Sequence, residues 1–312
     1  MAALAGVAGF LLATRGESVI IRAVHGDRAE LEWISDGVVS LGVVGLTYLW
    51  LHLRESQLRV VALEREQIVL DEQLRLAAEI QKSLLPDLPA GTPGFRWAAR
   101  MVPAGRIGGD FYDFFQPSPG STFVILGDVS GNGIPAALLL SSLKMLFRAT
   151  AQAAGDPAAV AERISAALYE QHAGMPYVTA IVARFDTPGP RLVYVNAGHP
   201  SGYLLRDQGA VTLDSGGPPL GMLPGVSYTA ATLDLLPGDV GVLVTDGITE
   251  ALDTAPVAWA QAVSAVRVGR DGPRSAATIC EDLMETAARG RGPEGVDGWQ
   301  DDRTVFVFTV EA

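Results

Sequence analysis

The stretch TFVILGDVSGNGIPAALL, residues 122–139, carries the clearest structural signal in the sequence. It opens on five β-branched, aromatic and aliphatic residues in a row, which is typical of a buried strand. Gly127 to Gly133 break that run, and a segment with an apolar helical face begins at Ile134. The pattern predicts a strand, a glycine-containing loop and a helix, with Asp128 at the end of the strand.

Three more acidic motifs lie near the ends of predicted strands: GGD at 108–110, TDGITEA at 245–251 and DDRT at 301–304. Carboxylates at the ends of neighbouring strands can meet at one rim of a sheet, and such hard oxygen ligands suit Mg²⁺ or Mn²⁺. Glycines let the backbone approach closely, so that a carbonyl can also reach a metal. The expected set is Asp128, Asp246 and Asp301, the Val129 carbonyl, and Asp110 from the turn before the second predicted strand.

Each motif is ambiguous when it is taken alone. An Asp-Gly pair is ordinary turn chemistry, and the Gly-Gly-Asp turn is also compatible with a nucleotide cyclase. DVSGNG resembles the start of a calcium-binding loop, but the twelfth position is Leu139, where such a loop needs a bidentate Glu. The inference therefore depends on the four motifs together.

From Phe95 onward, short β-rich runs alternate irregularly with helices. Strands are expected at 95–101, 122–129, 177–185, 191–196, 240–245 and 304–310. Helices are expected at 134–153, at 274–289, and from the Asp156 cap with Pro157 in first position to about Gln171. Without regular βαβ alternation, this order predicts an α+β domain in which helices cover antiparallel sheets.

Gly37 to Leu53 contains no Asp, Glu, Lys or Arg. Its length is at the low end for a transmembrane helix. Tyr48 and Trp50 lie near one end, and three arginines follow, which predicts a cytoplasmic location for the segment after it. The alternative is a buried helix of a soluble N-terminal domain. Residues 1–36 remain unassigned.

Residues 54–86 have the pattern of a helical linker. Pro86 and Pro89 end it. Its apolar positions predict a parallel dimeric coiled coil, and the alternative is one amphipathic helix packed on its own domain. The heptad seam consists of Val60, Leu63, Gln67, Leu70, Leu74, Ala77, Gln81 and Leu84.

The composition excludes several classes of protein. A formal net charge of −12 leaves no basic surface for nucleic acid. The single cysteine, Cys280, excludes an internal disulfide and a cysteine-based zinc site. No Gly-x-Ser-x-Gly elbow and no Walker loop occurs. An acidic protein acting on phosphate groups needs metal ions to offset repulsion.

Seven motifs in this order resemble the SpoIIE/RsbU-like branch of the metal-dependent serine/threonine protein phosphatases (the PPM, type 2C-like superfamily). The resemblance extends over residues 77–310 and implies an α-β-β-α sandwich at 87–312. The motifs are LLP at 84–86, PAGRIGGDFYDFF at 103–115, GDVSGNGIPAALL at 127–139, VNAGHP at 195–200, GGPPLG at 216–221, GDVGVLVTDGITEA at 238–251 and DDRT at 301–304.

The resemblance also implies a centre with two Mn²⁺ or Mg²⁺ ions. Asp128 matches the carboxylate that bridges both ions, and the Val129 carbonyl matches a main-chain ligand. Asp110 matches a ligand of one ion, and Asp246 and Asp301 match ligands of the other. In this family a hydroxide bridging the metals attacks phosphoserine or phosphothreonine directly.

Four further residues are candidates for phosphate or supporting contacts. His199 could donate a hydrogen bond or act as a general acid, and the alternative is a turn histidine that fixes the backbone. Arg106 could bind phosphate, and the alternative is a surface arginine. Gly247 and Asp302 adjoin two of the expected ligands.

The sequence departs from the family pattern in two places. Asn132 stands where the family has Lys, and the segment at 252–268 lacks the usual Phe-Gly pair.

The sequence therefore predicts a bacterial, membrane-anchored phosphatase, with its catalytic domain in the cytoplasm and a signal relayed through the linker. The expected partners are a phosphorylated protein, in this branch an anti-sigma-factor antagonist, and a second copy of the chain. The alternatives are a GGDEF-like nucleotide cyclase and a catalytically inactive signalling module of the same fold.

Overall fold

The computed structural model of the chain divides into two compact units, Met1–Glu72 and Gln73–Ala312. The sequence expectations for residues 1–27, for Asn132 and for nearly all of 252–268 lie outside the described residues. The structure describes residues 28–89, 91–131, 134–207, 209–214, 216–251, 268–269, 272–289 and 301–311.

The first described element is helix α2, which runs from Arg28 to Leu84 over 57 residues. From Gly37 onward it includes an 18-residue window with a mean hydropathy of 1.3, apolar and long enough to cross a membrane. The side chains of Leu46 and Tyr48 are 69% and 66% exposed. The segments at 37–53 and 54–84 therefore form one continuous helix with an exposed apolar surface.

The second unit contains two antiparallel five-stranded sheets, which confirms the predicted α+β class. The first sheet has the order β1 (Phe95–Val102), β12 (Arg303–Val310), β9 (Val240–Val244), β6 (Gly202–Arg206) and β7 (Gly209–Leu213). The second has the order β2 (Asp110–Ser118), β3 (Ser121–Val129), β4 (Val178–Asp186), β5 (Arg191–Ala197) and β8 (Ala231–Asp234). A separate two-stranded ribbon pairs β10 (Val268–Gly269) with β11 (Gly272–Pro273).

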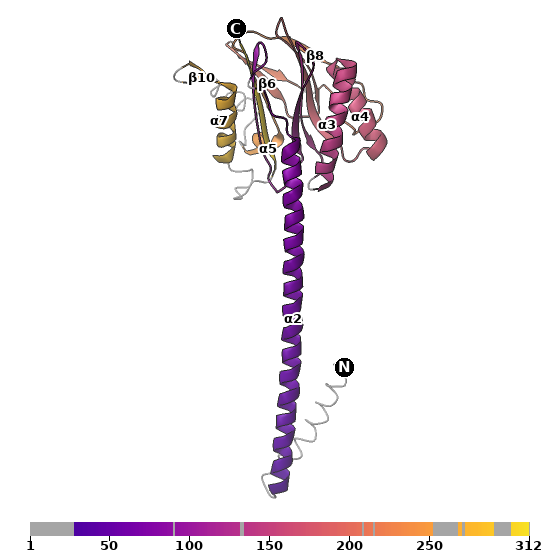
Figure 1. Ribbon diagram of the computed structural model, residues 1–312, viewed down its shortest axis with the longest axis vertical. Coiled ribbons are helices and arrows are strands. Elements are labelled where there is room, and N and C mark those ends of the chain that lie inside the picture. Colours follow the sequence, from indigo (N-terminus) through magenta and orange to yellow (C-terminus); the bar gives the residue numbers. More distant parts are fainter. Residues whose placement is uncertain are drawn as a thin grey trace. The chain divides into compact units, whose positions relative to one another are not determined.

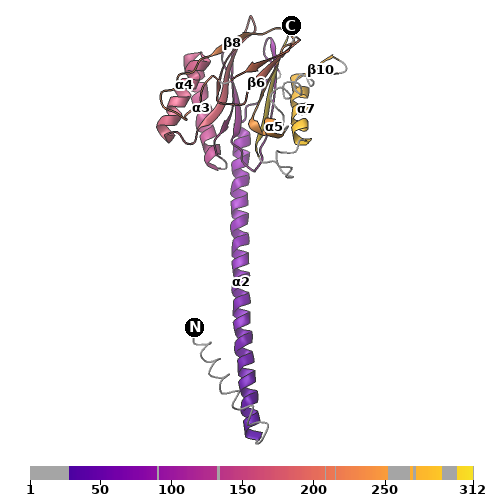
Figure 2. The same cartoon turned by 180° about the vertical axis from the view of Figure 1, so that it is seen from behind.

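Helices cover the outer faces of both sheets (Figures 1 and 2). Helices α3 (Ile134–Ala154) and α4 (Pro157–His172) pack on the second sheet, and α5 (Asp246–Ala251) and α7 (Ala276–Arg289) pack on the first. Asp156 caps α4 as expected, since its carboxylate accepts the N–H of Ala159. The layers form the α-β-β-α sandwich that the resemblance implies.

Three apolar cores follow from these layers. One lies under α3 and α4, one lies under α5 and α7, and the third lies between the sheets. Aromatic rings fill much of the third: Trp97 packs edge-on against Phe185 with ring centroids 4.9 Å apart, and Phe185 against Phe308 at 4.8 Å. The inter-sheet layer is therefore apolar and closely packed around these rings.

Four strands of the two sheets, β2, β6, β7 and β8, were not predicted from the sequence, and β2 is the one that bears on the site. Asp110 is the first residue of β2, a nine-residue strand that the sequence did not predict, and does not lie in a turn. The first five residues of β2 are buried. Because Phe111 faces α3 and α4 while Tyr112 faces the other sheet, both faces of the strand are covered, and the polar-apolar alternation of a one-sided strand is missing.

Candidate metal centre

The site begins where β2 and β3 pair. Asp110 is the direct cross-strand partner of Asp128 in this antiparallel ladder. Directly paired residues project from the same face of a sheet. The Gly109 carbonyl accepts the N–H of Val129 at 3.1 Å, which continues the pairing one step beyond the strand. The sequence motifs at 108–110 and 127–133 are therefore brought side by side.

Gly109 lies against a group of oxygen atoms. A Cβ on this residue would be 2.6 Å from Asp128 Oδ1, 2.8 Å from the Val129 carbonyl oxygen and 3.3 Å from the Gly131 carbonyl oxygen. A carboxylate oxygen and two carbonyl oxygens thus surround a small space that only glycine leaves open. These hard oxygen donors are the type that Mg²⁺ and Mn²⁺ prefer.

Asp110 connects this end of the β2–β3 pair to the other sheet. Its side chain is 1% exposed, and its Oδ2 accepts hydrogen bonds from the hydroxyls of Thr245 (2.7 Å) and Thr304 (2.6 Å). The Thr304 N–H in turn donates to Thr245 Oγ1 at 2.9 Å. Burial raises the pKa of Asp110 well above its usual value, although the two threonine hydroxyls oppose the shift. The motifs at 245–251 and 301–304 therefore hold Asp110 through their threonines.

The other acidic residues lie close enough to repel one another. Burial raises the pKa of Asp128 to about 7, and the charges of Asp246, Asp301 and Asp302 add to the shift. The pKa of Asp246 is raised by burial and then by Asp301. Asp246 lies two residues after β9, and Asp301 lies two residues before β12. The structure thus brings the acidic residues of both sheets to one end of the sandwich.

Two of these carboxylates are oriented by the next residue in the chain. The Gly247 N–H donates to Asp246 Oδ1 at 2.9 Å, and the Asp302 N–H donates to Asp301 Oδ1 at 2.8 Å. Asp301 is exposed and Asp246 and Asp128 are partly exposed, whereas Asp110 is buried. The acidic group therefore opens toward solvent on the side of Asp301.

Asp302 has a different position from its neighbour. Its side chain is 7% exposed, and its Oδ2 accepts the N–H of Gly109 at 2.5 Å and that of Asp110 at 3.4 Å. Its Oδ1 accepts the N–H of Ala104 at 2.8 Å. Asp302 thus fixes the loop that leads into β2, a role that the sequence could suggest only through its adjacency to Asp301.

His199 lies in a buried turn. Its backbone N–H donates to Asn196 Oδ1 at 2.8 Å, and its Nδ1 is 2.9 Å from Thr179 Oγ1. Burial lowers its pKa to about 4, which keeps the ring neutral near pH 7. These contacts fit the turn-histidine alternative. Arg106, on the loop before Gly109, has an exposed side chain.

The donor set fits a divalent cation, although the ligand roles stay predictions. In the part of the chain that the structure describes, no three acidic, histidine or cysteine side chains are already gathered into a closed metal-binding group. The residues do provide carbonyl and carboxylate oxygens around Gly109, together with acidic residues whose mutual repulsion a cation would relieve. Residues Asp110, Asp128, Val129, Asp246 and Asp301 would hold such ions.

Comparisons with known proteins agree with this arrangement. Phosphoserine phosphatase RsbU of Bacillus subtilis (strain 168) is 28% identical over 180 residues, which cover 57% of this chain and 53% of that protein. The chain spans about half the length, or less, of the curated relatives it matches.

Two solved structures have the same fold. The SiaA-PP2C domain of Pseudomonas aeruginosa aligns with a TM-score of 0.67 and 21% identity, covering 78% of this chain and 98% of that one. The catalytic domain of the serine/threonine protein phosphatase PstP, in complex with 2 manganese ions, aligns with a TM-score of 0.50 and 21% identity, covering 70% and 99%.

The sequence model of the family described as Stage II sporulation protein E (SpoIIE) matches residues 118–311, which is more than half of the chain. This match includes β3 with Asp128 and Val129, and it continues through Asp246 and Asp301. The chain belongs to the SpoIIE family.

Proposed function

We propose that the protein is a metal-dependent protein phosphatase that hydrolyses phosphoserine or phosphothreonine on another protein. The observation that carries the proposal is the Asp110–Asp128 pair, with the Val129 carbonyl beside the open space at Gly109. An acidic pair of this kind, with Asp110 buried and Asp128 partly exposed, is unfavourable by itself. Its presence in a chain of the SpoIIE family is best accounted for by a bound cation.

The centre is proposed to hold two Mn²⁺ or Mg²⁺ ions. Asp128 would contact both, with Asp110 and the Val129 carbonyl on one side and Asp246 and Asp301 on the other. Divalent ions at this place supply an activated water for attack on phosphorus and offset the charge of the phosphate. Asp302 and the two threonines keep the backbone and Asp110 in position for this role.

The substrate is proposed to be a phosphorylated regulatory protein, an antagonist of an anti-sigma factor. The support is the similarity to RsbU, which is named a phosphoserine phosphatase. The protein's own acidity, with a net charge of −12, agrees with a need for cations at the phosphate. The family match gives no support to the nucleotide-cyclase interpretation of Gly108-Gly109-Asp110.

We also propose that α2 anchors and dimerises the protein. Residues 37–53 would cross the bacterial membrane, residues 54–86 would form the linker, and the phosphatase domain at 87–312 would lie in the cytoplasm. Exposed apolar side chains support a second helix against the linker: Val60, Leu63 and Leu70 are 53%, 60% and 51% exposed. Burying such side chains against a second copy would be favourable.

The proposal is tested by phosphate release from a protein phosphorylated on serine. The full chain, purified in detergent, is assayed with Mn²⁺, after EDTA, and after Mn²⁺ is restored. We expect turnover that EDTA stops and added Mn²⁺ recovers. Formation of a cyclic dinucleotide from GTP, without phosphate release from the phosphoprotein, would favour the cyclase instead.

A further inference from the structure

The last turn of α2 carries a buried glutamine, Gln81, which binds Gly108 in the loop that leads into β2. The Gln81 side chain is 5% exposed. Its Nε2 donates to the Gly108 carbonyl at 2.7 Å, and its Oε1 accepts the Gly108 N–H at 3.1 Å. Both polar ends of the side-chain amide are therefore engaged by one residue, 27 positions away in the sequence.

Gly108 adjoins the residues that form the proposed centre. The next residue, Gly109, donates its N–H to Asp302 and gives its carbonyl to the N–H of Val129. Asp110 follows directly. A displacement of the Gly108 backbone would therefore move Gly109 against Asp128 and Val129, where the oxygens are within 2.6 to 2.8 Å of a Cβ position.

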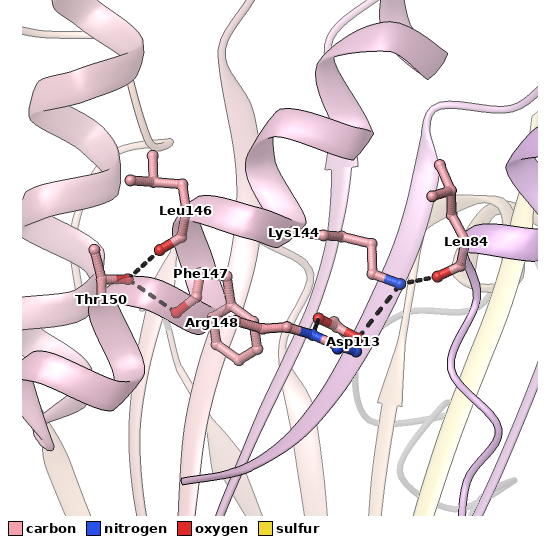
Figure 3. Close-up of polar contacts among 7 residues, drawn as sticks. All are labelled: Leu84, Asp113, Lys144, Leu146, Phe147, Arg148 and Thr150. Carbon is pink, nitrogen blue, oxygen red and sulfur yellow. Dashed lines mark hydrogen bonds and ion pairs between the residues drawn. The ribbon is translucent and has the colours of Figure 1, made fainter.

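A second set of contacts, around Asp113 and Lys144, holds the same helix end (Figure 3). Leu84, the last residue of α2, has a carbonyl oxygen that accepts from Lys144 Nζ. The same ammonium group lies 3.4 Å from Asp113 Oδ1. Arg148 binds both oxygens of Asp113, at 2.7 and 2.8 Å.

The end of α2 is thus bound directly to Gly108 and, through Lys144, to Asp113, and these two residues lie on either side of Asp110 in the sequence. Gly108 is two residues before it, and Asp113 is three residues after it. Asp113 is fully buried, so this second attachment is itself fixed in the fold. All of these residues lie within the Gln73–Ala312 unit.

The observed position of Gln81 differs from the one that the heptad pattern predicts. The heptad seam predicts Gln81 as a polar position facing a second helix. The structure instead buries its side chain on Gly108, whereas Gln67 and Gln73 on the same helix are exposed. Gln81 therefore serves its own domain and is not available to a partner helix.

We propose that Gln81 is a positioning residue for the metal centre: by holding Gly108 at both its N–H and its C=O, it sets Gly109 and Asp110 against Asp128 and Val129. This inference rests on the proposed function, because it assigns a residue to the same site. Through Gln81, the last turn of α2 would then help to position the residues of the metal centre. Residues that support metal ligands from outside typically contribute about 10-fold to 100-fold in metal affinity or activity.

The test uses the full-length chain with Gln81→Met, which keeps the length of the side chain and removes both hydrogen bonds. Gln73→Met, earlier on the exposed surface of the same helix, is the matched control. Mn²⁺ binding is measured by titration calorimetry, and amide hydrogen exchange is followed in peptides covering residues 104–115. Phosphate release is measured as a function of Mn²⁺ concentration.

We expect Gln81→Met to weaken Mn²⁺ binding by about 10-fold to 100-fold and to speed exchange at residues 108–110. Activity at saturating Mn²⁺ should stay close to that of the wild type, since all ligands remain. Gln73→Met should match the wild type in every measurement. A purely structural role would lower the melting temperature and leave the Mn²⁺ dependence unchanged, and that result would overturn the proposal.

The readouts separate the two proposals. If the wild type binds Mn²⁺ but releases no phosphate, while Gln81→Met still weakens binding and speeds exchange, the positioning role stands and the phosphatase proposal fails. If the wild type is an active phosphatase and Gln81→Met equals it in Mn²⁺ affinity and exchange, the positioning role is wrong. Should Gln81→Met not fold, Gln81→Glu, which keeps the oxygen that accepts from Gly108, is measured with the same expected direction.

Discussion

Asp110 and Asp128 are direct cross-strand partners on β2 and β3, and the two carboxyl groups share one face of the sheet. Like charges in this relation destabilise a sheet. The fold provides two threonine hydroxyls to Asp110, while Asp128 retains a raised pKa of about 7. We interpret this unfavourable pair as part of a cation-binding site, in which a bound cation would offset the repulsion.

The first prediction concerns pH and stability without metal. An Asp128 carboxyl with a pKa of about 7 in the folded chain and 3.8 unfolded disfavours folding once it is ionised. No penalty exists below pH 3.8, and the penalty grows until the pH has risen through about 7. In EDTA, the melting temperature of the wild type should therefore fall between about pH 4 and pH 7 relative to that of Asp128→Asn.

Comparison with the variant removes the contributions of groups that do not interact with Asp128, whereas the charge of Asp128 also raises the pKa of Asp110 and acts in the same direction. Burial of neutral His199 acts in the opposite direction, since its lowered pKa favours the folded state at higher pH. Melting temperatures of both proteins, measured by calorimetry at each pH, give the difference. Parallel curves for wild type and Asp128→Asn would contradict the raised pKa.

The second prediction concerns the space beside Gly109. Gly109→Ala would put a methyl group 2.6 Å from Asp128 Oδ1 and 2.8 Å from the Val129 oxygen. Phosphatase activity and Mn²⁺ binding should both be lost. Gly105→Ala is the control, because its nearest atom would be 3.9 Å away. An active Gly109→Ala protein would show that the space is not needed.

The third prediction concerns the threonine from the final acidic motif. Thr304→Val removes a hydroxyl that donates to the buried carboxylate of Asp110 at 2.6 Å. Losing one donor to this buried acidic group should cost about 1–3 kcal/mol in the free energy of unfolding. Urea unfolding measures the cost, and Thr304→Ser, which keeps the hydroxyl, should recover most of it. Equal loss in both variants would point to packing instead.

The fourth prediction concerns the ion pairs of Asp113. Asp113→Ala leaves Lys144 without its buried partner and frees Arg148, so the free energy of unfolding should fall by about 3 kcal/mol. The value is expected at the low end for a buried pair, because Arg148 is 45% exposed. Glu311→Ala breaks a solvent-exposed pair with Arg96 and should cost less than about 1 kcal/mol. Similar losses in the two variants, measured by urea unfolding, would contradict this difference.

Much of the fold could be predicted from the sequence because its signals are local. The apolar runs at β3, β4 and β12 and the Asp156-Pro157 cap are visible in short windows. Strand β2 is not visible in a short window, because its polar residues are stabilised by partners that are distant in the sequence. Asp113 needs Arg148 and Lys144, and Asp110 needs Thr245 and Thr304.

The candidate site shows the same limit. The order of the acidic motifs was enough to propose that Asp110, Asp128, Asp246 and Asp301 converge. The sequence suggested Asp302 as a supporting residue only through its adjacency to Asp301, and nothing local marks it as the acceptor for Gly109 or marks Gln81 as the partner of Gly108. These roles depend on contacts between segments 27 and 193 residues apart.

The most direct measurement is phosphate release from a serine-phosphorylated protein by the wild type and by Asp128→Ala and Asp246→Ala, at saturating Mn²⁺. Circular dichroism verifies that all three proteins are folded. We expect turnover by the wild type that EDTA abolishes, and no measurable turnover by either folded variant. Wild-type rates in either variant would contradict the metal centre proposed at these residues.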